Sequence, residues 1–458
     1  MTLIKSISGI RGTIGGKPGE NLTPIDIVEC TTAFGLWINK HHENATVVIG
    51  RDGRISGEMV SALVSNTLMS IGIDVIDLGY STTPTVEMAV VFEQAAAGIV
   101  LTASHNPKQW NALKFLNHKG EFISKTDGEE LLSYIEAGQL NFAEVEELGS
   151  YTKKEGLIQK HLQAILELPD VDVNKIKESG FKVVVDCINS TGAISIPPLL
   201  DLLGVQYVLL NDELTGDFAH NPEPLPAHLT DLCEAVVKEE ADLGISIDPD
   251  VDRLALVDEH GNLFGEEYTL VAVADHLLSR TPGNTVSNLS STRALRDVTQ
   301  HYGGEYYASA VGEVNVVEMM KAKNAVIGGE GNGGVIYPGL HYGRDALVGI
   351  AFILSLLAER STSLSALRAT YPDYYISKNK IELSPALDLD KIFEVLKERF
   401  KEEELNTIDG LKIDFEEGWV HLRKSNTEPI IRVYSESKSE QKSKDLAIQV
   451  MNIVQEMA

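Results

Sequence analysis

Three aspartates alternate along residues 248–253, which read DPDVDR: Asp248, Asp250 and Asp252. In an extended chain alternate side chains share one face, so we expect the three carboxylates to converge on one point. The apolar runs DLGISI and LALV flank them, so the cluster is expected to be shielded from solvent, where like charges repel strongly. Such oxygens suit a hard divalent cation, and the sequence therefore predicts a Mg²⁺ site.

Two other interpretations of this loop are weaker. A calcium loop of the EF-hand type would find Glu259 at its twelfth position, but Arg253 stands at the sixth, where glycine is required. An aspartyl-phosphate phosphatase with Asp248 as nucleophile would leave the stretch TASHNP, residues 102–107, without a role.

That stretch ends an apolar run on Ser104, with His105 beside it and Pro107 to stop the strand. Adjacent side chains point in different directions, so we expect His105 to be poorly placed as a base for Ser104. No G-x-S-x-G motif surrounds the serine, which disfavours a serine hydrolase. A serine that carries phosphate needs a metal and cations instead. Lys114, ten residues on, can return to the site as a base or a phosphate ligand.

Two further loops are suited to a sugar or a phosphate. The glycine-rich IGGEGNGG, residues 327–334, lets backbone approach a ligand closely and offers Glu330 and Asn332 to hydroxyl groups; a loop of tight turns is the alternative. The stretch RKSNTEPIIR predicts an anion site rather than a plain polar hairpin loop. Its donors are Arg423, Ser425, Asn426, Thr427 and Arg432. Arg11, between Gly9 and Gly12, is a candidate electrostatic stabiliser.

The formal net charge of the chain is 39 − 67 = −28, which argues against nucleic acid and acidic membrane surfaces as partners. No uncharged apolar stretch approaches about 18 residues, so no membrane span is expected. The N-terminus lacks the apolar core of a signal peptide. Cys30, Cys187 and Cys233 form no CxxC pair, which fits a reducing compartment and predicts a cytoplasmic protein.

Apolar β-branched runs alternate with helical patterns along most of the 458 residues, which predicts an α/β protein with mostly parallel sheets. Ligands of such sheets bind at the carboxyl ends of the strands, where the loops above lie. The last 80 or so residues instead read as a helix, strands around one polar loop and a closing helix, a smaller α+β domain. Polar stretches place the predicted domains at residues 1–148, 149–253, 254–370 and 371–458.

TASHNP, the triple-aspartate loop and SNTEP, in this order, resemble the α-D-phosphohexomutase family, and the resemblance covers nearly the whole chain. It implies four domains around a central cleft, three of them similar mixed α/β sandwich domains and the fourth a C-terminal α+β domain. It also implies a phosphoserine enzyme that interconverts 1- and 6-phosphosugars through a hexose 1,6-bisphosphate, which serves as activator and intermediate.

The resemblance also implies roles for single residues. Ser104 is identified as the phosphorylated serine, whose phosphate oxygen binds Mg²⁺ together with Asp248, Asp250 and Asp252. Arg253 would steady that phosphate, Lys114 and Arg11 would assist proton movement and offset charge, and His105 would neighbour the phosphate or sugar. Glu330 and Asn332 align with the sugar-binding loop. The distal phosphate loop takes in Arg423, Ser425, Asn426, Thr427 and Arg432.

The sequence departs from the family pattern in places. Pro249 and Val251 replace small residues of the metal loop, and Ala112 replaces a glycine, but the carboxylates are kept. Asn332 and Gly334 replace a serine and a histidine of the sugar loop. The resulting Gly-Glu-Gly-Asn-Gly-Gly is most similar to archaeal-type phosphoglucosamine mutases, which favours conversion of glucosamine 6-phosphate to glucosamine 1-phosphate.

Alternatives remain open: a phosphomannomutase/phosphoglucomutase, or a protein that binds sugar phosphates without turnover. The expected partner is a small phosphosugar, and the chain is expected to be a monomer or a homodimer.

Overall fold

The computed structural model describes residues 2–6, 9–43, 45–138, 140–382, 389–424 and 430–456. The chain divides into two compact units. Unit 1 comprises Met1–His276 and Asn332–Leu367, and unit 2 comprises Leu277–Gly331 and Arg368–Ala458. Among the described residues no helix combines the length and apolar character that crossing a membrane requires.

Unit 1 begins with a seven-stranded mixed sheet in the order β1-β2-β6-β5-β3-β4-β7. Its strands β3, β4, β5 and β7 run parallel, and β1, β2 and β6 add antiparallel pairs at one side. The strands are β1 Ile4–Ser6, β2 Gly9–Thr13, β3 Thr46–Arg51, β4 Asp74–Tyr80, β5 Ala97–Leu101, β6 Trp110–Leu116 and β7 Tyr151–Lys153. The helices are α1 Pro24–His41, α2 Gly57–Ser70, α3 Thr83–Phe92 and α4 Lys125–Ala137, followed by a short 3-10 turn Val145–Glu147.

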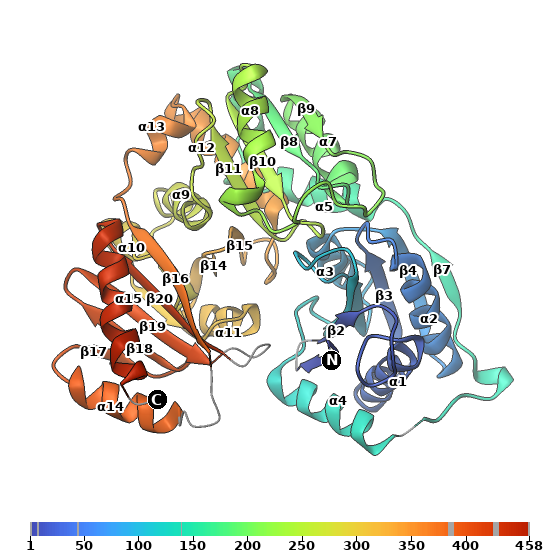
Figure 1. The fold of residues 1–458 in the computed structure, drawn as a ribbon. Helices are drawn as coiled ribbons and strands as arrows, with labels where there is room; N and C mark the ends of the chain where they lie inside the picture. The colour runs from blue at the N-terminus through green and yellow to red at the C-terminus, as the bar shows by residue number, and fades with distance from the viewer. Residues whose placement is uncertain are drawn as a thin grey trace. The chain divides into compact units, whose positions relative to one another are not determined.

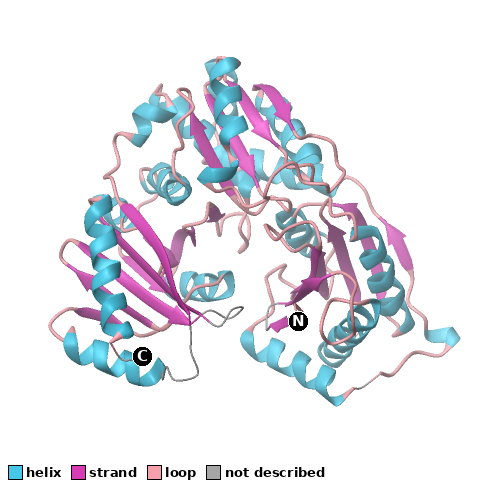
Figure 2. Ribbon diagram, viewed as in Figure 1, coloured by secondary structure: helices cyan, strands magenta, loops and turns pink. Residues whose placement is uncertain are grey.

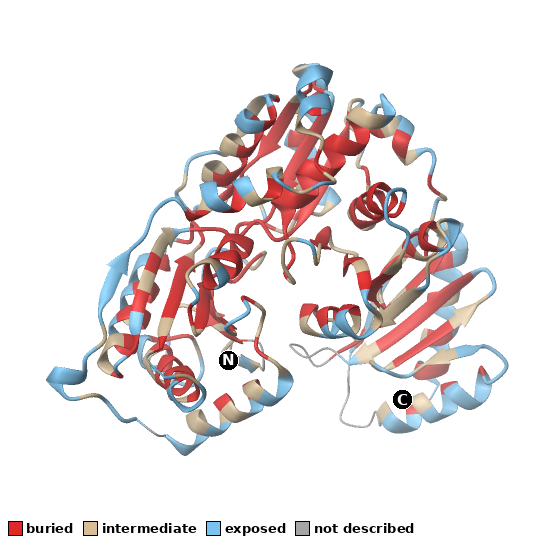
Figure 3. Cartoon of the chain, turned by 180° about the vertical axis from the view of Figure 1, so that it is seen from behind, coloured by how far each residue is buried: buried red, intermediate tan, exposed pale blue. Residues whose placement is uncertain are grey.

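The continuous apolar run of β3 follows from burial on both sheet faces. Val47 and Ile49 belong to the core cluster that takes in residues of α1 and α2, whereas Val48 lies in a second cluster with residues of α3. Figure 3 shows the central strands of this sheet as buried and parts of the covering helices as exposed.

A second sheet of unit 1 has the order β11-β10-β8-β9, with β8 parallel to β9 and β10, and β11 antiparallel to β10. Its strands are β8 Lys182–Asp186, β9 Gln206–Leu210, β10 Leu243–Ile247 and β11 Leu254–Asp258. The neighbouring helices are α5 Leu157–Leu166, α6 Val173–Ser179, α7 Gly192–Leu203 and α8 Thr230–Lys238, with a 3-10 turn Pro226–His228. Unit 1 also contains β15 Gly334–Ile336 and α12 Ala346–Arg360; α9 Glu266–Leu278 and α13 Leu364–Arg368 lie at its boundaries.

Unit 2 combines a parallel set of strands with an antiparallel sheet (Figures 1 and 2). The parallel strands are β13 Tyr306–Ser309, β12 Asn284–Asn288 and β14 Ala325–Glu330, with α10 Ala294–His301 and α11 Glu313–Lys323. The antiparallel sheet runs β16-β20-β19-β18-β17. Its elements are β16 Tyr375–Glu382, α14 Leu389–Arg399, β17 Glu404–Asn406, β18 Leu411–Phe415, β19 Gly418–Lys424, β20 Ile430–Ser437 and α15 Glu440–Gln455, which packs on β16, β19 and β20.

The predicted fold class is confirmed. Sheets of mostly parallel strands alternate with helices through the first three quarters of the chain, and the C-terminal part is the predicted α+β domain with a closing helix.

Candidate active site

Ser104 lies three residues beyond the end of β5, in a left-handed backbone conformation with φ +49°. This conformation is unfavourable for a residue with a Cβ atom, so the surrounding contacts must hold it. One of these contacts is the Ser104 N–H, which donates to Thr102 Oγ1 at 2.9 Å. The Ser104 hydroxyl donates to Asp248 Oδ2 at 2.7 Å, and the residue is only 7% exposed.

His105 lies closer to the serine than expected. Its Nδ1 atom is 3.3 Å from Ser104 Oγ, so the prediction that the two side chains point apart is wrong. The left-handed turn at Ser104 is the reason, because an extended chain would separate adjacent side chains. Burial, followed by the nearby cations Arg253 and Arg344, lowers the pKa of His105 to about 2, so its ring is neutral near pH 7.

The aspartate loop connects β10 to β11, and all three of its aspartates are fully buried. The expected extended geometry is wrong: Val251 has φ +62°, and its N–H donates to Asp248 O in a turn. The turn nevertheless brings one ligand atom of each of Asp248, Asp250 and Asp252 within 4.8 Å of the others.

Some oxygen atoms of these carboxylates accept hydrogen bonds, and others have no donor among the described residues. Asp250 Oδ2 accepts from Lys114 Nζ at 2.8 Å and from Thr83 Oγ1 at 2.6 Å. Asp252 Oδ2 accepts from Arg344 Nη2 at 2.7 Å. The Oδ1 atoms of Asp250 and Asp252 are buried and have no hydrogen-bond partner among the described residues. Buried anionic oxygens without donors fit a cation, so the residues present fit the predicted metal.

The pKa values of two of these aspartates shift in opposite directions. Burial, with the charges of Asp252 and Asp250, raises the pKa of Asp248 well above its usual range. Burial acts in the same sense on Asp250, but Lys114, Thr83 and Arg344 together outweigh it, and the pKa of Asp250 is lowered. Arg253 adds a third cation, with Nε 3.8 Å from Asp248 Oδ2 and 3.9 Å from Asp252 Oδ1.

Arg11 lies on β2, which pairs with the strand β6 that carries Lys114. It stands opposite Ala112, two positions from the pairing of Gly9 with Lys114. Burial lowers the pKa of its guanidinium.

Of the residues predicted to bind the sugar or the distal phosphate, some lie in unit 1 and others in unit 2. Asn332 lies in unit 1, where its side-chain oxygen accepts from Gly334 N at 3.2 Å. In unit 2, Glu330 ends β14 and accepts from Asn288 Nδ2 at 3.0 Å. Ser425, Asn426 and Thr427 lie outside the described residues.

Arg423 of β19 stands directly opposite Arg432 of β20. Like charges in cross-strand positions destabilise a sheet unless an anion lies nearby. Arg423 Nε is buried without a hydrogen-bond partner among the described residues. Burial lowers the pKa of Arg423 against the opposing charge of Asp409, and Arg432 adds to the lowering. The pair therefore provides a cationic position suited to a phosphate.

Thr83, Arg344 and Arg54 contact the site but do not follow from the sequence motifs named above. Thr83 and Arg344 each donate to one aspartate, and Arg54 donates to the backbone of the serine loop. The motif GRDGR at the end of β3 was a usable signal for Arg54, since ligand-site residues follow parallel strands. No sequence motif around Arg344 indicates that its side chain reaches the aspartate loop. Its side chain occupies the space beside Gly334, where a Cβ atom would lie 2.4 Å from Arg344 Cδ.

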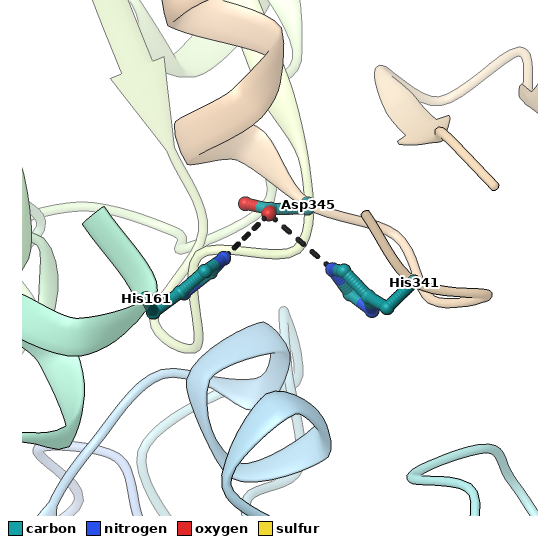
Figure 4. Close-up of side chains that lie close together, drawn as sticks. All are labelled: His161, His341 and Asp345. Carbon is teal, nitrogen blue, oxygen red and sulfur yellow. Dashed lines mark hydrogen bonds and ion pairs between the residues drawn. The ribbon is translucent and has the colours of Figure 1, made fainter. Parts of the chain in front are cut away.

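A second polar cluster of unit 1 contains His161, His341 and Asp345 (Figure 4). Both Nε2 atoms approach Asp345 Oδ2, at 3.0 Å from His161 and 3.3 Å from His341. Thr85 Oγ1 lies 3.0 Å from His161 Nδ1, and Glu87 Oε2 lies 3.2 Å from His341 Nδ1. All four ring nitrogens thus lie beside a protein oxygen, and the cluster is a polar network that links α3, α5 and the start of α12.

Four family models match successive parts of the chain. Models of the phosphoglucomutase/phosphomannomutase α/β/α domains I, II and III match residues 3–141, 159–261 and 265–374. The model of the C-terminal domain of that family matches residues 378–453.

Individual relatives cover the chain almost completely. A probable phosphoglucosamine mutase of Methanopyrus kandleri is 33% identical over 98% of this chain and 96% of its own length. A phosphoglucomutase/phosphomannomutase of Thermococcus kodakarensis is 36% identical over 95% of this chain and 96% of its own. The crystal structure of a phosphoglucomutase/phosphomannomutase family protein from Burkholderia thailandensis superposes with a TM-score of 0.85, at 25% identity, over 99% of this chain and 98% of that one.

With this fold, the family matches and the relatives show a phosphosugar mutase. The chain belongs to the phosphoglucomutase/phosphomannomutase family.

Proposed function

We propose that this phosphohexomutase works through a phosphoserine at Ser104 and converts glucosamine 6-phosphate to glucosamine 1-phosphate through a 1,6-bisphosphate. The observation that carries the proposal is the contact between Ser104 Oγ and Asp248 Oδ2, 2.7 Å apart, beside the two open Oδ1 atoms of Asp250 and Asp252. A nucleophilic oxygen and a cation site next to each other are what phosphoryl transfer requires.

The metal site would take Mg²⁺ on Asp248, Asp250, Asp252 and an oxygen of the phosphoserine. When bound, the ion would supply positive charge against the phosphoryl oxygens. Arg253, whose guanidinium lies within 4 Å of two of these aspartates, is placed to hold the same phosphate.

Transfer to the sugar breaks the bond between Ser104 Oγ and phosphorus and forms a bond from a sugar hydroxyl oxygen to phosphorus. The hydroxyl proton must leave at the same time, and the released Ser104 Oγ must gain a proton to become a hydroxyl again. Lys114 is the proposed group for that proton, and Arg11 for offsetting charge. Because the Asp250 carboxylate holds the Lys114 ammonium at 2.8 Å, this lysine rests protonated, with its pKa raised against burial by Asp250 and Asp252. A protonated lysine accepts no proton, so Lys114 must pass one on before it takes the hydroxyl proton, and the released Ser104 Oγ is the acceptor that balances the step. His105 is the proposed neutral neighbour of the phosphate.

The distal phosphate is proposed to bind at Arg423 and Arg432, with the donors of Ser425, Asn426 and Thr427. The facing guanidinium groups support this assignment. Glu330 and Asn332 are proposed to bind sugar hydroxyls or the amino group, since a carboxylate accepts from both.

The names of the relatives leave the hexose open, because one is named a probable phosphoglucosamine mutase and the other a phosphoglucomutase/phosphomannomutase. The Asn332 and Gly334 form of the sugar loop supports glucosamine. Measured kcat/KM on glucosamine, mannose and glucose 6-phosphates tests the choice. We expect kcat/KM to be at least tenfold higher for glucosamine 6-phosphate. A higher kcat/KM for mannose or glucose 6-phosphate would instead identify a phosphomannomutase/phosphoglucomutase.

The phosphoserine is tested by intact mass and by Ser104→Ala. Wild-type protein incubated with glucose 1,6-bisphosphate should gain the mass of one phosphate, and the variant should gain none and lose mutase activity. Near wild-type turnover by the variant would refute the proposal. Tight binding of phosphosugars by wild-type protein with no turnover in either phosphorylation state would instead support a non-catalytic binding protein. The cytoplasmic location, the monomer or homodimer state and the boundaries of the four domains remain predictions.

A further inference from the structure

Arg54 follows β3 and is 1% exposed, yet the structure satisfies all of its side-chain donors. Its Nε–H donates to Asp52 Oδ2 at 3.0 Å. Its two terminal nitrogens donate to four backbone carbonyls, all of them on residues that follow β5. These carbonyls belong to Ser104, Asn106, Pro107 and Trp110. Five N–H groups therefore meet five acceptors, and the planar fork of an arginine is the side chain that can do this.

Asp52 holds the same loop from its other side. Its Oδ2 atom accepts from Thr102 Oγ1 at 2.6 Å, and Thr102 Oγ1 accepts from the N–H of Ser104 at 2.9 Å. Both the N–H and the carbonyl of Ser104 are thus tied to residues 52–54. This explains how a serine keeps a backbone φ of +49°, a conformation that costs energy unless neighbouring contacts impose it.

Gly53 connects this segment to the aspartate loop. Its N–H donates to Ser190 Oγ at 3.0 Å, and the Ser190 hydroxyl donates to Pro249 O at 2.6 Å. Pro249 lies between Asp248 and Asp250, so a single hydroxyl joins the 52–54 segment to the centre of the metal loop. A Cβ atom on Gly53 would lie 2.9 Å from Ser190 Oγ, which leaves no room for a larger residue.

We propose that the 52–54 segment sets the position of Ser104 relative to Asp248, Asp250 and Asp252, with Arg54 as the positioning residue on the serine side and Ser190 as its counterpart on the metal side. The inference rests on the proposed function, in which phosphate moves to and from Ser104. Phosphoryl transfer depends chiefly on alignment, and a misplacement of about 1 Å can reduce a rate by about 10²-fold. Neither residue contacts Ser104 Oγ in the described structure, so their effect acts through the backbone of the two loops.

The test compares Arg54→Lys with wild-type protein. A lysine ammonium has three N–H groups against five acceptors, so at least two acceptors lose their donor while the charge is kept. The rate at which Ser104 takes phosphate from glucose 1,6-bisphosphate, followed by intact mass, should fall about 10²-fold. The kcat of the mutase reaction should fall in parallel, with KM changed less than threefold.

Arg293→Lys is the matched control. Arg293 is a buried arginine of unit 2 whose Nη2 donates to Phe415 O at 2.8 Å and Gly418 O at 2.7 Å. Arg293→Lys should lower the melting temperature about as much as Arg54→Lys does. Phosphate uptake by Ser104 should stay within threefold of the wild-type rate. Equal rates for Arg54→Lys and Arg293→Lys would overturn the proposal, because the effect would then reflect stability alone.

Ser190→Ala provides a small change on the metal side that keeps the Thr191 Oγ1 bond to Pro249 O at 2.8 Å. Hydrogen exchange read by mass spectrometry should be faster in peptides covering residues 248–253 of this variant, and in peptides covering residues 102–110 of Arg54→Lys. Unchanged exchange in both variants would overturn the proposal whatever the enzyme's activity. If the wild-type protein takes no phosphate, the proposed function fails, and the exchange result still decides whether the 52–54 segment holds the two loops.

Discussion

Two buried threonines of unit 1 provide a direct test of how the aspartate loop is stabilised. Thr83 is 1% exposed, and its hydroxyl donates to Asp250 Oδ2 at 2.6 Å. Thr31 is fully buried in α1, and its hydroxyl has no hydrogen-bond partner among the described residues. Replacing each by valine removes one hydroxyl and keeps the shape of the side chain.

The expected cost of Thr83→Val follows from the charge and burial of its acceptor. A hydrogen bond to a charged group contributes about 1.5–3 kcal/mol, and Asp250 is fully buried, so little solvent replaces the lost donor. The backbone bond from Thr83 N to Asp250 O at 2.9 Å is kept, so the loss is limited to the hydroxyl. The shift is about 2–4 °C per kcal/mol for domains of about 150–250 residues and smaller for larger ones, so the melting temperature should fall by at most roughly 12 °C.

Thr31→Val should shift the melting temperature by less than about 2 °C, or raise it, because removing an unpaired buried hydroxyl removes a desolvation cost. Differential scanning calorimetry in EDTA compares the two variants without bound metal. Equal shifts for Thr83→Val and Thr31→Val would refute the reasoning, because the aspartate would then gain nothing from its donor.

Three further predictions concern other residues. The pKa of His341 is raised to about 10 by Asp345 and Glu87 against the effect of burial, so its contribution to stability is complete below pH 6.5 and disappears as the pH rises through 10. Chemical unfolding should therefore show that His341→Asn is destabilising at pH 6 and much less so at pH 10; a constant difference would contradict the assigned charge. Arg423→Gln should raise KM about 10- to 100-fold with a smaller change in kcat, as expected for a lost phosphate contact; steady-state kinetics measure this, and an unchanged KM would place the distal phosphate elsewhere. Gly334→Ala should lower stability by about 1–3 kcal/mol, because its Cβ would displace Arg344 from Asp252; a melting temperature equal to wild type would show that the arginine has room to move.

The sequence was sufficient for the elements and for the loops that end them. Buried β5 and β10 are short apolar runs bounded by polar residues, and this local pattern alone predicts that Ser104 and Asp248 follow strands. Prolines and glycines then mark where each strand must stop. These signals act within a few residues, which is the range over which sequence patterns are informative.

The contacts that align the loops could not be predicted in this way. Arg54 and Ser104 are 50 residues apart, and Arg344 and Asp252 are 92 apart. Arg54 meets the serine loop because β5 lies beside β3 in the sheet while β4 lies on the other side of β3. That order is a property of the whole sheet. The same limit explains the error on His105, since the left-handed backbone of Ser104 depends on these distant donors.

The balance of charge around the aspartates suggests how so acidic a chain maintains this site. When all three are ionised, the buried carboxylates of Asp248, Asp250 and Asp252 match the charge of three cations, Lys114, Arg253 and Arg344. Buried charges are tolerated when they are paired, so the loop can fold before any ligand binds. A divalent cation alone would leave an excess of positive charge, and a phosphoserine alone, which carries about two negative charges, would leave the opposite excess. Together they restore the balance, so the proposed metal and the proposed phosphate should each strengthen the binding of the other.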